Sequence, residues 1–574
     1  MSSPRSYRKL ALAASLLLAP LGAQTAAQNA NRFVPEGSTI VFRMASPAKW
    51  KDKFGKTQAA KLLQSNTLAP MMQQFEAAWQ MGLDEARNSG EIDVDLIESM
   101  LTDWQGDIVV SMQMDIAEMV SVMQTGGEPT ISGTMVMTPG GNFDLTRFSA
   151  EVMRLAEEQN EMHDLVVGDI TLRAGTPPGG RMDLAICPDV DGALVMMFGT
   201  DLEASAERLL AKDHRSAVPM GDGPLFMHMD LSWISSVIDA AIDGQAPPEA
   251  AAIVEDLMRL LGASALRGIN LDIDTEGEHV LGNLQLQLTK NDRGLLDVIG
   301  TAASGTPKLL RAVPANAEAF SVSSLDLGKL YTIVAEAWAT FGDQVPMSFD
   351  DAMQAFADAT KVRLKEDLLD HLAGEMMSVQ DVEAMMNAEF DPDEDNPMAM
   401  LDGTVYGIGL KDGAAFGKSL ETALRARGMH AGRKTEEYGT HQVHRLKLGG
   451  LIELEYVVTD DLLLLGVGNG EGTSRALRSV LDARATGDTE LPEVVRKHAE
   501  GMPAGWNGIG ATPIASMMRM MSTAMAMNPN VGEELEMASM VMNGLAAELT
   551  RLGLGSMTSA TYVDQNGITA RMRW

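Results

Sequence analysis

The sequence predicts an α+β protein made of two tandem duplicated halves, each with a largely antiparallel sheet packed by helices. The first indication is a phrase that occurs four times: an apolar residue, a proline, a few small or polar residues and a strand-like apolar run. The copies begin at Val34-Pro35, Val218-Pro219, Val313-Pro314 and Met502-Pro503. Repetition at long intervals indicates duplication. The second indication is that turns between neighbouring predicted strands are too short for the crossovers that parallel pairing requires.

Hydrophobic periodicity predicts the elements of the first half, residues 32–302, which holds modules starting near 34 and 218. Helical spacing extends over 50–79, and further helices are expected at 145–158, 202–210, 232–241 and 249–261. Strands are expected at 107–114, 131–137, 166–172, 182–186 and 194–198, and two more turn at 275–278. Strands and helices occur in groups, which is typical of an α+β fold.

The second half, residues 308–574, holds modules starting near 313 and 502, and its elements follow the same order. Helices are expected at 327–341, 349–372, 414–426, 473–481, 512–527 and 533–552. Strands are expected at 375–379, 403–410, 442–446, 452–458, 462–467 and 568–574, with a turn at 565–567. Two local matches align the halves: Gly133-Thr134 with Gly403-Thr404, and 191–199 with 460–468.

The first 27 residues have the pattern of a secretory signal peptide. Arg5, Arg8 and Lys9 precede an apolar stretch at 10–21, and Thr25-Ala26-Ala27 offers small residues for cleavage. The apolar stretch is shorter than the roughly 20 residues that a membrane-spanning helix needs. The mature chain is therefore expected to be extracytoplasmic, either periplasmic or secreted, with no transmembrane segment.

Charge and cysteine content exclude several classes of protein. With 79 acidic and 45 basic residues the chain carries a formal charge of −34, which repels phosphate backbones and anionic lipid surfaces. A nucleic-acid partner is therefore not expected. The single cysteine, Cys187, excludes an intramolecular disulfide framework and a cysteine-cluster metal site. We interpret Cys187 as a small buried apolar residue, with a reactive thiol as the alternative.

One acidic segment offers weak candidates for metal ligands. Asp391, Asp393 and Asp395 alternate, and Asp402 stands at the twelfth position, as in a calcium-binding loop. Asn396 stands where such a loop needs its glycine, and the terminal glutamate is missing. A solvated surface loop is the alternative interpretation. No cofactor is predicted.

Methionine is the compositional anomaly, with 42 residues. A helical stripe is formed by Ile514, Met517, Met518, Met521 and Met525. Because methionine is dispersed through the whole chain, we interpret it mainly as a substitute for leucine in the cores. Two alternatives stay open: a copper site made of Met-x-x-Met pairs such as Met517 and Met520, and an adaptable apolar groove for a lipid or peptide.

Patterns typical of catalysis occur only as fragments. Ser46 and Lys49 have serine-x-x-lysine spacing, but the lysine-threonine-glycine partner motif is missing. The glycine run at 466–472 lacks the spacing of a dinucleotide fingerprint. His441 and His444 are expected on opposite faces of a strand, and His228 is interpreted as an ordinary hydrogen-bonded histidine. No catalytic residue is predicted.

The module openings at Val34-Pro35 and Val313-Pro314, together with the strand-helix units at 191–210 and 460–481, allow one comparison. With these features and its signal peptide, the chain resembles an uncharacterised class of large secreted bacterial proteins known only as a domain of unknown function. The resemblance implies an extracytoplasmic location and a duplicated architecture, and it carries no catalytic residues.

These observations lead to one expected function and two alternatives. We expect a non-enzymatic extracytoplasmic binding or scaffold protein of the bacterial cell envelope, with an envelope protein or an apolar ligand as its partner. The first alternative is a carrier that holds a lipid or peptide in a cavity lined by methionine and leucine. The second is a secreted hydrolase without a recognisable motif.

Overall fold

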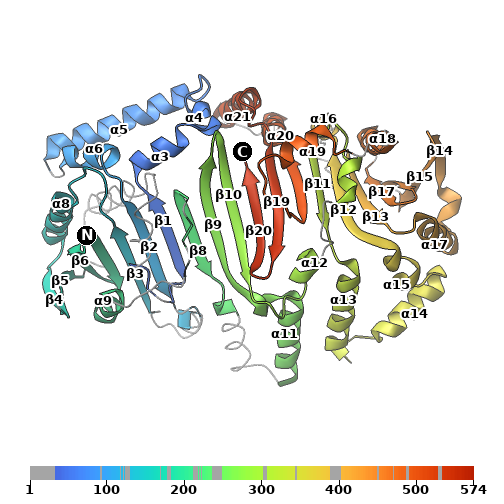
Figure 1. Cartoon of the computed structure of the whole chain (residues 1–574), viewed down its shortest axis with the longest axis horizontal. Coiled ribbons are helices and arrows are strands. Elements are labelled where there is room, and N and C mark those ends of the chain that lie inside the picture. The colour runs from blue at the N-terminus through green and yellow to red at the C-terminus, as the bar shows by residue number, and fades with distance from the viewer. Residues whose placement is uncertain are drawn as a thin grey trace. The chain divides into compact units, whose positions relative to one another are not determined.

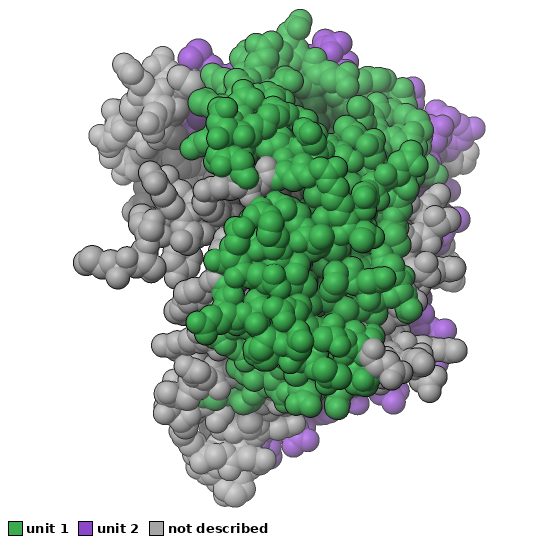
Figure 2. Space-filling model, turned by 90° about the vertical axis from the view of Figure 1, so that its left-hand side faces the viewer, with its two compact units in different colours: residues 1–241, 267–286 green, residues 242–266, 287–574 purple. Residues whose placement is uncertain are grey.

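The computed structural model divides the chain into two compact units (Figure 2). Unit 1 comprises Met1–Ala241 and Arg267–Leu286, and unit 2 comprises Ile242–Leu266 and Gln287–Trp574. The structure describes residues 33–35, 37–90, 93–114, 116, 118–119, 122, 130–168, 170–176, 182–210, 218, 220–221, 223–234, 248–300, 307–342, 345–387, 403–448, 452–468, 471–485, 490–527 and 533–574. The expected signal peptide and most of the helix expected at 232–241 lie outside these residues.

The described residues of unit 1 form ten strands. They are β1 (Ile40–Ala45), β2 (Asp107–Met114), β3 (Ile131–Met137), β4 (His163–Val167), β5 (Ile170–Gly175), β6 (Asp183–Val190), β7 (Ala193–Gly199), β8 (Leu225–Asp230), β9 (Leu266–Glu276) and β10 (His279–Leu288). The helices are α3 (Pro47–Phe54), α4 (Gln58–Leu63), α5 (Ala69–Ser89), α6 (Val94–Thr102), α8 (Leu145–Gln159) and α9 (Leu202–Leu210).

The strands of unit 1 pair antiparallel in the order β10-β9-β8-β1-β2-β3-β7-β6-β5-β4 (Figure 1). Side chains alternate between the two faces of such a sheet. On one face Met44 and Met137 pack with residues of α6 and α8, such as Leu96 and Leu145. On the other face α9 packs through Leu202. This second face, called here the α9 face, carries the candidate site.

In unit 2 the part of the chain that the structure describes also forms ten strands. They are β11 (Ala319–Ser324), β12 (Leu372–Gln380), β13 (Thr404–Leu410), β14 (Lys434–Tyr438), β15 (His441–Leu448), β16 (Ile452–Val458), β17 (Leu462–Val467), β18 (Gly508–Thr512), β19 (Met557–Asp564) and β20 (Gly567–Arg573). The α-helices are α11 (Pro248–Leu261), α12 (Leu296–Gly300), α13 (Leu327–Phe341), α14 (Phe349–Thr360), α15 (Leu364–Asp367), α16 (Val382–Asn387), α17 (Gly413–Ala426), α18 (Glu471–Ala485), α19 (Glu493–Ala499), α20 (Ile514–Met527) and α21 (Glu533–Arg551). Short 3₁₀ helices are η2 (Ala263–Ala265), η3 (Lys308–Ala312), η5 (Leu369–His371) and η7 (Met429–Gly432).

The strand order of unit 2 is β20-β19-β18-β11-β12-β13-β17-β16-β15-β14, again antiparallel. Numbered from the start of each unit, this is the order found in unit 1. Helix α18 and the 3₁₀ helix η3 pack through Leu477 and Leu310 on one face of the sheet. Helix α17 packs through Phe416 on the other face.

Aspartate caps fix the start of several helices. Asp144, Asp326 and Asp412 each accept a hydrogen bond from the backbone amide three residues later, at 2.9, 2.8 and 2.9 Å, and so begin α8, α13 and α17. Such a cap satisfies an amide that has no partner inside the helix. The sequence therefore sets these helix starts locally, whereas the hydrophobic faces of the helices decide where they pack.

The α+β class and the antiparallel sheets are confirmed. Three differences from the sequence prediction have local causes. The strand expected at 166–172 is the hairpin of β4 and β5, which turns at Gly168 with φ +60°. The helix expected at 349–372 ends at Lys361, whose φ of +62° closes α14. Strand β14 was not predicted because Lys434–Tyr438 is polar and exposed.

Candidate functional site

The α9 face of the unit 1 sheet carries a line of polar side chains through its middle, which we call the central row. It runs across five adjacent strands, from β9 to β3, because consecutive members are direct cross-strand partners. The row consists of Asn270, His228, Val41, Ser111 and Thr134. All five side chains are buried, yet four of them are polar.

The same line can be followed across the five matching strands of unit 2. There it consists of Thr558, Ala511, Phe320, Val379 and Val405. Ala511, Phe320, Val379 and Val405 belong to one continuous apolar core. In unit 1 the apolar residues of this face form two separate clusters, one around Val195 and one that includes Val41 of the row itself. At three of the five positions a polar residue of unit 1 is matched by an apolar residue of unit 2, namely His228 by Ala511, Ser111 by Val379 and Thr134 by Val405.

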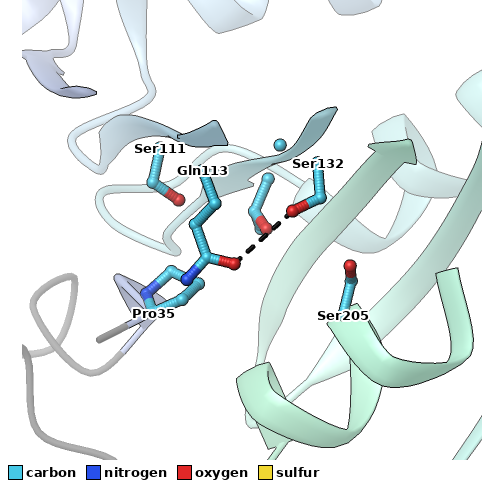
Figure 3. Close-up of a pocket in the computed structure, with 7 residues that line it drawn as sticks. Pro35, Ser111, Gln113, Ser132 and Ser205 are labelled. Carbon is cyan, nitrogen blue, oxygen red and sulfur yellow. Dashed lines mark hydrogen bonds between the residues drawn. The ribbon is translucent and has the colours of Figure 1, made fainter. Parts of the chain in front are cut away.

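A cleft of about 190 Å³ opens beside Ser111 and Thr134 in unit 1 (Figure 3). Its lining consists of Pro35, Ser111, Gln113, Ser132, Gly133, Thr134 and Ser205. Strands β2 and β3 supply one wall, and α9 places Ser205 on the opposite side. The centre of the cleft has room for about one water molecule. Gly133 is required here because a Cβ atom would lie 2.1 Å from the Phe198 ring.

The lining is uncharged and rich in hydroxyl groups. Ser132 donates a long hydrogen bond of 3.4 Å to the amide oxygen of Gln113, and Ser205 donates to the Asp201 carbonyl at 2.7 Å. Ser111 and Thr134 have no hydrogen-bond partner for their hydroxyls among the described residues. Both hydroxyls belong to residues that line the cleft and are not among the fully buried polar atoms without a partner, so water that enters the cleft can reach them. The cleft therefore presents unused hydrogen-bonding capacity to any molecule that enters it.

His228 lies further along the central row and belongs to a chain of hydrogen bonds. Its Nδ1 is 2.7 Å from Oδ1 of Asn270, and Nδ2 of Asn270 donates to Gln285 at 3.1 Å. Since Asn270 uses its amide nitrogen for Gln285, its oxygen accepts from His228, which places the proton on Nδ1. The sequence interpretation of His228 as an ordinary hydrogen-bonded histidine is confirmed.

Beside the central row, unit 1 buries a cluster of charges. Nε of Arg43 lies 3.7 Å from Asp107, and Nζ of Lys49 lies 3.6 Å from the other carboxylate oxygen. Arg43 also donates to the carbonyls of Gly221 and Gly223. Burial lowers the pKa of Lys49 below its ordinary value, and the attraction of Asp107 opposes this shift. The cluster joins β1, β2 and α3 to the segment that contains Gly221.

Asp272 is the neighbour of this cluster on β9. Burial raises the pKa of the Asp272 carboxyl above its ordinary value of 3.8, and the nearby charge of Asp274 adds to the shift. In unit 2 two of the matching positions are apolar, because Val322 takes the place of Arg43 and Ala560 takes that of Asp272, whereas the position of Asp107 is again acidic, Glu375. The buried arginine on the first strand is thus a second difference between the units.

The catalytic fragments found in the sequence do not form an open site. Ser46 begins α3, but its hydroxyl is fully buried and makes no capping bond. Lys49 faces Asp107. His444 contacts Thr435 at 3.0 Å and packs on the Tyr456 ring, and burial lowers its pKa. These contacts are typical of structural roles.

Part of the methionine stripe of α20 is exposed, whereas the sequence interpretation placed methionine in the cores. Met517 and Met521 are 47% and 57% exposed. The contact between α20 and α21 is made instead by small residues, among them Ser522, which donates to the Ser539 carbonyl at 2.8 Å. The interpretation is confirmed for Met137 and Met197, which are fully buried in unit 1, and it is wrong for Met71 and Met81, which are 53% and 68% exposed.

Two candidates from the sequence remain. Cys187 lies within the described residues, whereas the acidic segment does not. Cys187 is buried, and burial raises the pKa of its thiol, as expected for an inert apolar position. Asp391, Asp393, Asp395 and Asp402 lie outside the described residues. Within the described ranges no group of three or more histidine, cysteine, aspartate or glutamate side chains could hold a metal ion. The same ranges contain no helix that combines the length and hydropathy needed to cross a bilayer.

The sequence prediction missed the cleft residues. Asp107, Val109, Ser111 and Gln113 alternate on one face of β2, which indicates a polar surface, whereas the structure buries the first three. The comparison of the two halves contained a signal, because valines stand at the positions of the second half that match Ser111 and Thr134. The pattern of one strand alone could not reveal that difference.

Comparisons with known proteins add little to this description. No family model and no curated protein match the chain. Three solved structures of TP0453, in crystal forms I, III and IV, are similar over 45–49% of this chain and 78–91% of theirs. Their sequence identity is 9–10% and their TM-scores are 0.21–0.22. Similarity at this level identifies no family, and the functional argument rests on the residues of this chain.

Proposed function

We propose that this protein is a non-enzymatic, extracytoplasmic binding protein of the bacterial cell envelope, and that the α9 face of unit 1 holds its binding site. The observation that carries the proposal is the central row. Ser111 and Thr134 are buried without hydrogen-bond partners beside a cleft, at positions where unit 2 has Val379 and Val405.

Valine at positions 111 and 134 would extend the apolar core across the sheet, as it does in unit 2. Thr134 and valine have nearly the same shape, so the change requires no repacking. Hydroxyl groups kept at such positions are best explained by a ligand that completes their hydrogen bonds.

We further propose that the two halves, 32–302 and 308–574, arose by duplication and then diverged. The shared strand order supports this, as does the pairing of strands at matching positions. The pairing also refines the sequence alignment. Thr134 matches Val405 and not Thr404, so the correspondence drawn between the glycine-threonine pairs is one residue out of register. The chain then carries one binding half and one half with an apolar core.

The non-enzymatic part of the proposal is supported by the environment of the two residues with catalytic spacing. A nucleophile must be reached by its substrate, and Ser46 is fully buried. Lys49 is held beside Asp107. The alternative of a secreted hydrolase would require a nucleophile and a base within hydrogen-bond reach in an accessible cleft.

A second candidate function, an apolar partner, is favoured by one observation. Met521 on α20 and Met540 on α21 are 57% and 64% exposed, beside the buried contact of Ser522 with Ser539. Adaptable methionine surfaces accept varied apolar partners. The described cleft is lined by hydroxyls, so an apolar ligand would bind this helix pair and not the cleft.

The proposed function can be tested by native mass spectrometry of the mature protein purified from its own envelope. We expect a bound mass on the wild-type protein and its loss in Ser111→Val/Thr134→Val. The matched control is Ser149→Ala, which removes a fully buried hydroxyl without a partner, in α8 of unit 1. This control should keep the bound mass. A bare wild-type chain, or a mass that survives in the double variant, would contradict the proposal.

A further inference from the structure

We propose that the ligand of the unit 1 cleft is a neutral carbohydrate, and that one of its hydroxyl or hydroxymethyl groups occupies the cleft. This inference deepens the proposed function and rests on it. It names a ligand class from the chemistry of Ser111, Gln113, Ser132, Thr134 and Ser205.

The lining of the cleft contains no charged side chain among the described residues. Taking an ionised group out of water without an opposite charge is strongly unfavourable, so the lining selects against charged ligands. The formal charge of −34 adds long-range repulsion against anions in particular. A neutral ligand is the class that both features favour.

The lining also has a high hydrogen-bonding capacity. Four hydroxyls and one amide line a small space, and each of these groups can both donate and accept. An apolar group in the cleft would displace water and leave the hydroxyls of Ser111 and Thr134 without partners, which is unfavourable. A sugar hydroxyl also donates and accepts at the same atom, so one such group can satisfy several of these neighbours at once.

The cleft is small, because its enclosed centre has room only for a group the size of a water molecule. The cleft therefore suits a single hydroxyl or hydroxymethyl group, while the sugar ring stays at its mouth. A ligand held in this way should bind weakly as a monosaccharide and more tightly as part of a chain.

Unit 2 does not repeat this chemistry. At the positions that match Ser111, Gln113 and Thr134 it has Val379, Asp381 and Val405, and Asp381 forms an ion pair of 2.5 Å with Arg475. A charged pair and two valines replace the neutral hydroxyl lining. We therefore expect one such carbohydrate site for each chain.

The test is ligand-observed saturation-transfer NMR on the full mature protein. The neutral probes are glucose, galactose, mannose and N-acetylglucosamine, and the matched anionic probes are glucuronate and galacturonate. We expect saturation transfer to at least one neutral sugar and at least tenfold weaker binding of the matching uronate, at both low and high salt. High salt removes the repulsion between the uronates and the rest of the protein, so the remaining difference reports the cleft.

Variants connect the signal to the cleft. Ser111→Val/Thr134→Val should abolish the transfer, whereas Ser149→Ala should retain it. Thr134→Ser keeps the hydroxyl and should also retain the saturation transfer. This variant guards against a loss of signal caused by misfolding. The inference is overturned if no neutral sugar binds, if the uronates bind as well as the neutral sugars at high salt, or if the double variant binds normally.

The sugar-binding result and the native mass spectra together distinguish a wrong ligand class from a wrong binding site. If all sugars fail, but the native protein carries another mass that Ser111→Val/Thr134→Val removes, the carbohydrate class is wrong and the binding site stands. If the sugars fail and the double variant keeps every bound mass, both the class and the site are wrong.

Discussion

Units 1 and 2 have the same strand order but differ in what fills the middle of the sheet. In unit 2 the central row continues one apolar core through Phe320, Val379 and Val405. In unit 1 the same line presents His228, Ser111 and Thr134, and charges are buried beside it. The same strand order thus accommodates either a polar or an apolar central row. Unit 2 shows that apolar residues fit the same strand order, which supports the proposal that unit 1 uses these polar groups for binding.

We expect the largest change in the free energy of unfolding when the buried charge cluster of unit 1 is altered. Arg43→Met leaves Asp107 buried beside Lys49 alone and removes the bonds to Gly221 and Gly223, so we expect a loss of about 3–5 kcal/mol in the free energy of unfolding. Denaturant titration measures this loss. The control is Arg43→Met/Asp107→Leu, which replaces charge by apolar volume and should recover much of the stability. A double variant as unstable as the single one would show that the charges are not coupled.

The central row can be exchanged between the units. Val405→Thr introduces the hydroxyl of unit 1 into the fully buried core of unit 2, with an expected loss of about 1–3 kcal/mol. Thr134→Val is the reciprocal change, and it should leave stability equal or higher. Denaturant unfolding of both variants checks the pair. Equal losses in both directions would contradict the claim that the Thr134 hydroxyl lacks a stabilising partner.

Asp272 provides a test that depends on pH. Its folded pKa is raised above 3.8, so the folded state binds its proton more tightly, and the ionised form costs stability above the folded pKa. As pH falls through that pKa toward 3.8, the cost disappears. We expect Asp272→Asn to be more stable than wild type at pH 7 and equal to it at low pH. Melting temperatures across this range provide the measurement.

A matched control exists for the pH test on the same strand. Asp274 forms an ion pair of 2.7 Å with Lys53, so Asp274→Asn removes a favourable contact. It should not stabilise the protein at pH 7. If the two variants gave the same pH profile, the effect would come from net charge and not from the burial of Asp272.

The smallest expected effect concerns side chains outside the cores. Met521 is exposed on α20, so Met521→Gln should change the free energy of unfolding by no more than about 0.5 kcal/mol. Ala546→Met, at the fully buried contact with α20, should cost about 1–3 kcal/mol by overpacking. Thermal unfolding compares them. A large loss for Met521→Gln would restore the interpretation of the methionine stripe as core.

The elements were predictable from the sequence where one local rule decides them. Periodicity and capping placed the helix Leu327–Phe341 and the strand Ile452–Val458 at their observed bounds. The break at Lys361 was not predictable, because a left-handed residue other than glycine leaves no clear sequence signal. The cleft was missed for a different reason. The burial of Ser111 and the meeting of β2 with α9 depend on packing between segments that are far apart in the chain.

Hydrogen exchange tests the central claim most directly, because mass spectrometry of peptides from β2 and β3 reports unit 1 separately from unit 2. The comparison is between the wild-type protein and Ser111→Val/Thr134→Val, both without added ligand. Our account expects the amides of these strands to exchange equally slowly or more slowly in the double variant. Faster exchange would mean that the two hydroxyls stabilise the fold, and the explanation of the central row as a binding feature would be wrong.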